Sequence, residues 1–108
     1  MREAAIRIER KERAVGELPS IELLEATHEF PGPYIFKAIG RVENGFAARV
    51  VAAVREELAD ATDPPFKLRE AVGGRHVSVT VVPTVQSGSQ VLAVYRRIRT
   101  IAGLVMLW

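Results

Sequence analysis

The chain has 108 residues and no cysteine, and its 15 Lys and Arg against 13 Asp and Glu give a formal net charge of +2. This length predicts one domain with a modest core, and the missing cysteines exclude disulfides, thiol catalysis and cysteine-based zinc sites. So small a surplus of cations does not by itself indicate a nucleic-acid partner. No apolar run reaches the roughly 18 residues of a membrane span, and no secretory signal is recognisable. We therefore expect a cytoplasmic protein without a membrane segment.

Residues 1–19 are predicted to be an extension in front of a domain over 20–108. Helix formers dominate residues 2–15, with two Glu–Arg pairs at i,i+4. The alternation of Ile6 and Ile8 also suits a strand. We expect a solvated helical or frayed extension rather than a dedicated binding arm.

The domain begins with a short helix over 21–26. Pro31 and Pro33 then exclude helix and favour extended backbone in the residues before them. Bulky residues follow and predict the first strand, over 34–39, which Gly40 is expected to end.

An amphipathic helix is predicted over 46–59, after the turn dipeptide Asn44-Gly45. Asn44 is the expected N-cap. The apolar positions at i+4 spacing are Phe46, Val50, Val54 and Leu58.

Two strands joined by a glycine hairpin are predicted next. The strand over 66–72 alternates, with Phe66 and Leu68 expected to be its half-buried side. The strand over 76–82 has valines on one side and polar residues on the other. Those polar residues are His76, Ser78 and Thr80.

The last two elements are a second amphipathic helix and an apolar strand. Ser87 and Gln90 have the spacing of a capping box in front of a helix over 88–101. Gly103 is expected to terminate this helix, and residues 104–108 to form the final strand.

The predicted order after residue 33 is therefore strand, helix, strand, strand, helix, strand. This order predicts an α+β fold, the ferredoxin-like βαββαβ sandwich. Its four-stranded antiparallel sheet has the strand order 4-1-3-2, with both helices on one face.

Several motifs resemble those of a known family. Residues 29–40 have the pattern E-F-P-x-P-x-x-x-K-x-x-G, and Gly74 precedes the Ser-Val-Thr run at 78–80. The Val-Tyr pair at 94–95 and the apolar end at 104–108 also match. The sequence resembles the YbeD-like family of small uncharacterised bacterial proteins.

The resemblance covers residues 20–108 and implies a ferredoxin-like fold similar to the ACT regulatory domains of amino-acid metabolism. It implies no activity. The chain departs from the family pattern at His76, where tyrosine is common, and at Val105, where lysine or arginine is common.

The period of two residues divides the helix-free face of the sheet into two halves. The predicted apolar half comprises Ile35, Ile39, Val105 and Leu107, with Lys37 at its border. The predicted polar half comprises Lys67, Arg69, His76, Ser78 and Thr80. Leu104, Met106 and Trp108 are expected to face the core.

A solvated sheet face does not normally carry four adjacent aliphatic side chains. Either residues 1–26 cover them, or a second protein does, in a homodimer or a hetero-complex. In the second case the interface consists of Ile35, Lys37, Ile39, Val105 and Leu107.

The turn before the first long helix is the predicted ligand site. In ACT domains, small effectors bind near the equivalent loop, and a helix start offers free backbone N–H groups. The residues concerned are Gly40, Asn44 and Gly45. The alternative is a turn that requires glycine only for its backbone conformation.

No catalytic constellation is found. His28 and His76 have no partner at a metal-ligand spacing, and no nucleophile or phosphate-loop motif occurs. We expect no enzyme, metal or cofactor, and predict a regulatory or protein-interaction module that senses a small metabolite. The alternative is an RNA-associated domain using the polar half, although the third strand presents no outward aromatic for base stacking.

Overall fold

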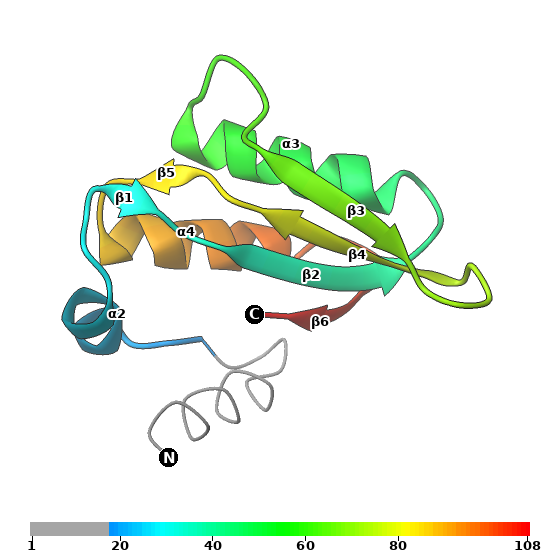
Figure 1. Cartoon of the computed structure of the whole chain (residues 1–108), viewed down its shortest axis with the longest axis horizontal. Helices are drawn as coiled ribbons and strands as arrows, with labels where there is room; N and C mark the ends of the chain where they lie inside the picture. The colour runs from blue at the N-terminus through cyan, green and yellow to red at the C-terminus, as the bar shows by residue number, and fades with distance from the viewer. Residues whose placement is uncertain (1–17) are drawn as a thin grey trace.

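The computed structural model describes residues 18–108, so most of the predicted extension (1–19) lies outside the described residues. The described chain is a mixed α+β protein (Figure 1). Its helices are α2 (Ile21–Thr27), α3 (Phe46–Leu58) and α4 (Gly88–Ile98). Its strands are β1 (Gly32–Pro33), β2 (Phe36–Arg41), β3 (Phe66–Glu70), β4 (His76–Val81), β5 (Thr84–Val85) and β6 (Leu104–Leu107).

The main sheet has four antiparallel strands in the order β3-β4-β2-β6. In this sheet β6 therefore lies beside β2, and β2 lies beside β4. Helices α3 and α4 pack against each other on one face of this sheet (Figure 1). The arrangement is compatible with a ferredoxin-like sandwich. A two-stranded sheet of β1 and β5, which was not predicted, lies at one end.

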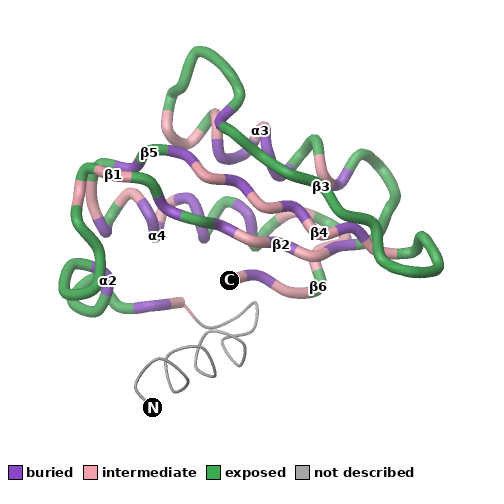
Figure 2. Tube along the Cα trace, in the orientation of Figure 1, coloured by how far each residue is buried: buried purple, intermediate pink, exposed green. Residues whose placement is uncertain are grey.

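The core lies between the sheet and the two long helices (Figure 2). Strand β4 shows the expected alternation, because its three valines are buried and its polar residues are half-buried. In β2 the buried side consists of Phe36, Ala38 and Gly40. The hydroxyls of Tyr34 and Tyr95 meet within this core at 3.1 Å, so each polar tip has a partner.

Gly40 was predicted to end the first strand, and this prediction was wrong. Strand β2 continues to Arg41, and Gly40 is buried within it beneath the ring of Phe46. A Cβ atom at residue 40 would lie 2.3 Å from Cζ of Phe46. Glycine is therefore needed here because the aromatic ring occupies the space of a side chain.

The predicted N-cap of α3 was wrong. The N-cap is Gly45, with φ 65°, and no side chain caps the helix. Asn44 also has a positive φ, of 56°, because the chain reverses through two left-handed residues, which Asn and Gly tolerate best. The prediction of a turn at this dipeptide was right.

Strand β6 differs most from the prediction. Leu104 pairs with Gly40, but Met106, not Val105, pairs with Ile39, so Val105 is the extra residue of a β-bulge. The bulge reverses the side-chain phase of every later residue. Leu107, predicted to face outward, is opposite Ala38 and only 3% exposed.

The bulge turns Met106 and Trp108 to the open face, although both were predicted to face the core. Met106 pairs with the outward Ile39. Trp108 exchanges two backbone hydrogen bonds with Lys37, at 2.6 and 2.8 Å. Since directly paired residues share one face of a sheet, Trp108 lies on the same side as Lys37.

Strand β3 was predicted to be half-buried, and it is exposed throughout. Phe66 and Leu68 are 45% and 53% exposed. They alternate onto the helix side, opposite Val81 and Val79. However, α3 packs mainly on the inner strands β4 and β2, so the edge strand is covered less than they are.

Helix α4 is held at its start by α2. Ser87 caps the helix by accepting a hydrogen bond from the N–H of Gln90, and Gln90 accepts one from Gln86 rather than from Ser87, as a full capping box would require. From α2, a carboxylate oxygen of Glu25 accepts the N–H of Gly88 at 2.8 Å. The negative charge also complements the positive end of the helix dipole.

We therefore predict that Glu25→Gln lowers the free energy of unfolding by about 1 kcal/mol, because it removes the charge from this hydrogen bond. Urea unfolding followed by circular dichroism measures the change. Glu29→Gln, in the exposed segment after α2, is the matched control, since its carboxylate makes no interaction with another described residue and does not lie at the start of a helix. Equal losses in the two variants would contradict the contact.

Candidate functional site

The strand register places the open-face residues in rows. One row across the sheet contains Trp108, Lys37, Thr80 and Lys67. The next contains Met106, Ile39, Ser78 and Arg69. A third begins with Arg41 and His76. We call these ten residues the open face.

The open face is cationic. It carries two lysines, two arginines and a histidine, and no Asp or Glu occupies any position of its three rows. Within residues 18–108, none of these lysines and arginines forms an ion pair with a carboxylate. The formal net charge of +2 for the whole chain therefore conceals a local excess of positive charge, which creates an attractive potential for anions.

Trp108 is the aromatic element of this surface. The Nζ atom of Lys37 lies 5.5 Å from the centroid of the indole ring, within the range of a cation–π interaction. Both side chains are half-buried. The contact orients the ammonium group and places it beside an aromatic ring.

A shallow hollow of about 280 Å³ lies on the open face. Its lining includes Lys37, Ile39, Arg69, His76 and Trp108. Glu70, at the end of β3, is the one carboxylate among its lining residues. The hollow combines an apolar floor with cationic walls, which suits a carboxylate or another anion attached to an apolar group.

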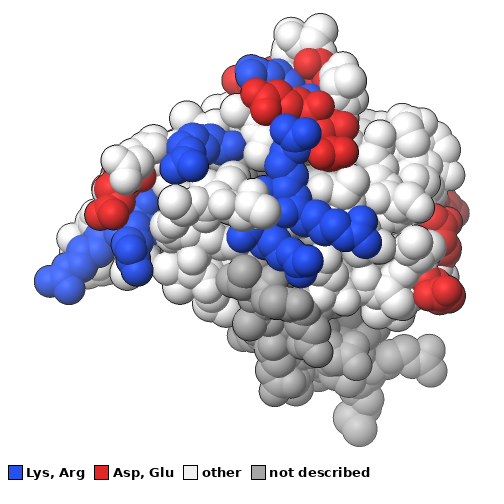
Figure 3. Space-filling model, turned by 180° about the vertical axis from the view of Figure 1, so that it is seen from behind, with Lys and Arg blue, Asp and Glu red and all other residues white. Residues whose placement is uncertain are grey.

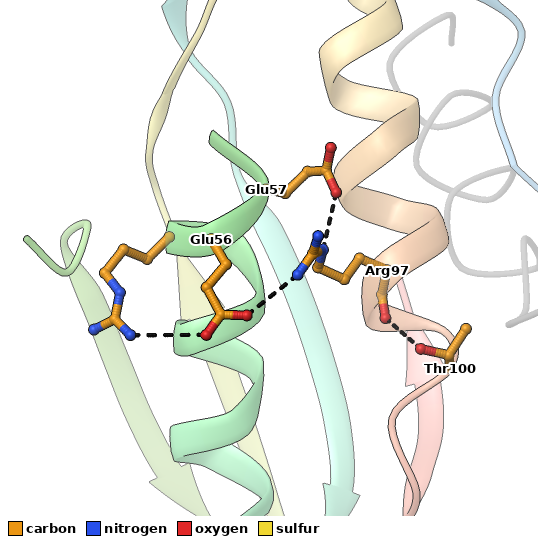
Figure 4. Close-up of polar contacts among 5 residues, drawn as sticks. Glu56, Glu57, Arg97 and Thr100 are labelled. Atoms are coloured by element: carbon orange, nitrogen blue, oxygen red, sulfur yellow. Dashed lines mark hydrogen bonds and ion pairs between the residues drawn. The ribbon is translucent and has the colours of Figure 1, made fainter. Parts of the chain in front are cut away.

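The opposite side of the molecule carries cations too (Figure 3). Acidic side chains lie close to them at the upper part of that view. Arg97 of α4 donates to Glu57 at 2.9 Å and to Glu56 at 3.2 Å, both on α3 (Figure 4). Glu56 and Glu57 therefore link the two helices, and Arg97 is partly neutralised.

The structure distributes the predicted interface residues differently. Lys37 and Ile39 lie on the open face, as expected. Ile35 precedes β2 and is 52% exposed, and Val105 on the bulge is 44% exposed. Leu107 belongs to the core instead. All five residues of the predicted polar half lie on the open face.

The three residues of the predicted ligand turn do not converge. Gly40 is buried under Phe46, whereas Asn44 and Gly45 are exposed at the start of α3. The amide of Phe46 is already bonded to the carbonyl of Glu43. Effector binding at this turn stays a prediction.

Sequence reasoning missed Trp108 and Met106. Residues 104–108 are all apolar, so no polar residue marks which side of the strand faces water. The amphipathic character of Trp, which is enriched at binding surfaces, was the available signal.

The described part of the chain shows neither a cluster of metal ligands nor a membrane-spanning helix. There, no group of three or more His, Asp or Glu side chains is placed to hold a metal ion. His28 is an exposed C-cap of α2, and its ring lies 4.8 Å from that of Tyr34. Among residues 18–108, no helix has the length and apolarity needed to cross a bilayer.

Fold and surface together define a small α+β protein with a cationic open sheet face. A family model described as "Protein of unknown function (DUF493)" matches residues 25–107. Since the match spans more than half of the chain, the protein belongs to this family. This confirms the resemblance inferred from the sequence motifs.

A curated relative agrees with this assignment. UPF0250 protein RSc0326 of Ralstonia nicotianae is 25% identical over 80 residues, which cover 74% of this chain and 82% of that protein. The chain is thus similar to this relative along most of the described domain.

Proposed function

We propose that this protein is a non-enzymatic regulatory module that binds an acidic partner protein through its open face. The observation that carries the proposal is the set of four cations, two on β2 and two on β3, with no described carboxylate paired to any of them. Charges arranged in this way accelerate association with an acidic surface and select against basic partners.

The apolar members of the open face supply the remaining affinity. Ile39, Met106 and Trp108 are half-buried, so a partner seated on them removes further apolar area from water, at about 25 cal/mol per Å². Tryptophan is frequent among residues that dominate binding energy. Lys37, held over the indole, lies where the apolar and cationic parts meet.

A second copy of the chain is a weaker candidate for this face. Stacking two open faces would bring two sets of unpaired cations together, and like charges in an interface cost free energy. The predicted homodimer could still form through Ile35 and Val105, the two residues of the predicted interface that flank the open face. Light scattering on Val105→Lys tests it, since an unchanged molar mass would exclude that contact.

Single-stranded RNA is the second candidate. Trp108 favours it, because an aromatic ring beside a lysine on an open sheet face can stack a base and meet a phosphate. The tryptophan lies on the edge strand β6, however, and the central strands β2 and β4 present no Phe, Tyr or Trp on this face, only the imidazole of His76. An acidic protein requires no stacking and is favoured for that reason.

The test uses the full chain on a surface coated with poly-L-glutamate. We predict that Lys37→Glu weakens retention about tenfold at low salt, because it reverses the central charge of the open face. Arg96→Glu, on the exposed side of α4, is the matched control and is expected to change retention much less. Equal losses would show attraction by net charge alone and would contradict the proposal.

Polyuridylate in the same assay separates the two candidates. Retention on RNA that exceeds retention on poly-L-glutamate, and that Trp108→Ala abolishes, would favour the RNA-binding alternative. The proposal predicts the reverse order.

A further inference from the structure

Strand β3 leaves one side of its backbone without a partner strand in the described chain. It pairs with β4 alone and forms one edge of the sheet (Figure 1). The carbonyl of Pro65 accepts a hydrogen bond from the N–H of Val82, and the N–H of Ala71 donates one to the carbonyl of His76. Because such bonds recur at every second residue of an antiparallel pair, residues 67 and 69 also face β4, and the amides of Phe66, Leu68 and Glu70 point to the free edge.

The helix side of this edge is an apolar groove of about 350 Å³ between β3 and α3. Its apolar walls are Ala47, Ala48, Val51 and Ala52 from the helix, with Phe66 and Leu68 from the strand. The ion-paired Arg55 and Asp63 also line it. The alanine side chains are short and fill little of the groove. The side chains of Phe66 and Leu68 therefore stay about half exposed. An edge strand with exposed apolar residues normally pairs or aggregates unless something covers it.

The open-face side of the same edge is cationic. Lys67 and Arg69 are exposed and form no ion pair with any residue from 18 to 108. The strand therefore offers a fixed alternation, with apolar residues toward the groove and cations on the other face.

We propose that β3 accepts an additional strand, an extended segment of the partner protein in which acidic and apolar residues alternate. Its backbone would bond to the free amides and carbonyls of residues 66, 68 and 70, a recognised mode of peptide capture. Its acidic side chains would lie beside Lys67 and Arg69, and its apolar side chains would enter the groove. This inference rests on the proposed function, from which it takes the acidic character of the partner.

Charge also argues against a second copy at this edge. An antiparallel β3–β3 pair centred on Leu68 would place Lys67 of each copy opposite Arg69 of the other. Like charges directly opposite in a sheet are destabilising. An acidic strand meets the same positions with attraction.

The experiment titrates full-length protein into a fluorescein-labelled peptide, Ser-Glu-Val-Glu-Val-Glu-Val-Ser, and measures anisotropy. Leu68→Ala and Leu68→Pro form a matched pair, since both remove the leucine and only proline removes the outward N–H. We expect proline to weaken binding up to about tenfold beyond alanine, the effect of one backbone hydrogen bond. Glu70→Pro with Glu70→Ala repeats the comparison if Leu68→Pro does not fold.

Charge exchange provides the second readout. The Lys67→Glu/Arg69→Glu variant is expected to lose the glutamate peptide and to bind the peptide with lysine in place of glutamate. Equal affinities for the proline and alanine variants would overturn strand addition. So would failure of the wild-type protein to bind the peptide, or a proline variant that converts a dimer into a monomer, which would assign the edge to a second copy.

The outcomes also distinguish the two proposals. If Lys37-dependent retention on poly-L-glutamate persists while the proline and alanine variants bind alike, only strand addition fails. If neither poly-L-glutamate nor the peptide is bound, the proposed function fails with it.

Discussion

Replacement of Gly40 by alanine is expected to lower the free energy of unfolding by about 2–3 kcal/mol, the cost of overpacking a tight core. The added methyl group would lie within 2.5 Å of three ring carbons of Phe46. Neither side can retreat easily, because Gly40 lies between β4 and β6 and the ring is 1% exposed. Urea unfolding measures the loss.

A double-mutant cycle tests the cause. Phe46→Leu removes the ring atoms that an alanine at residue 40 would meet, so Gly40→Ala should cost less in that background than in the wild type. Additive losses would mean that the glycine serves a different purpose. An unchanged denaturation midpoint for Gly40→Ala alone would contradict the packing described here.

Leu107→Ala is expected to cost about 2–4 kcal/mol, as is usual for a buried leucine. The β-bulge at Val105 is the reason, since it directs Leu107 onto Ala38 and into the core. Val105→Ala, two residues earlier and 44% exposed, is expected to cost less than about 0.5 kcal/mol. Thermal unfolding of the two variants measures the contrast.

This pair also tests the register of β6. Without the bulge, residues 105 and 107 would share a face and the two losses would be similar. A larger loss for Val105→Ala than for Leu107→Ala would contradict the observed pairing.

The sequence was sufficient to predict the elements in which apolar and polar residues occupy different sides. Valines alternate with polar residues in β4, so both its existence and its inward side could be predicted. The i+4 apolar spacing of α3 placed Phe46, Val50 and Val54 on the buried side, as the structure has them. In each case a polar neighbour marks the side that faces water.

Two features lay beyond such patterns. Strand β6 is apolar at every position, so its phase depends on a bulge that arises only when it pairs with β2. The exposure of Phe66 and Leu68 depends on how far α3 extends over the sheet, which is a property of helix packing and not of the local pattern.

The candidate site was predicted in part for the same reason. The cations of β3 and the polar positions of β4 were assigned correctly to the open face from their alternation. Lys37 also lies on the open face as predicted, but the residue beside it on β6 is Trp108, which was predicted to face the core. This difference converts a predicted aliphatic patch into an aromatic and cationic surface.

Trp108 offers the most direct test of the central claim, because it is the only tryptophan of the chain and it lies on the open face. The measurement is its fluorescence emission during titration of the full-length protein with poly-L-glutamate at low salt. If an acidic partner is bound on the open face, the emission will change saturably, and Lys37→Glu will suppress the change. If the polymer is bound without any change in Trp108 emission, the binding surface lies elsewhere and the proposed function is wrong.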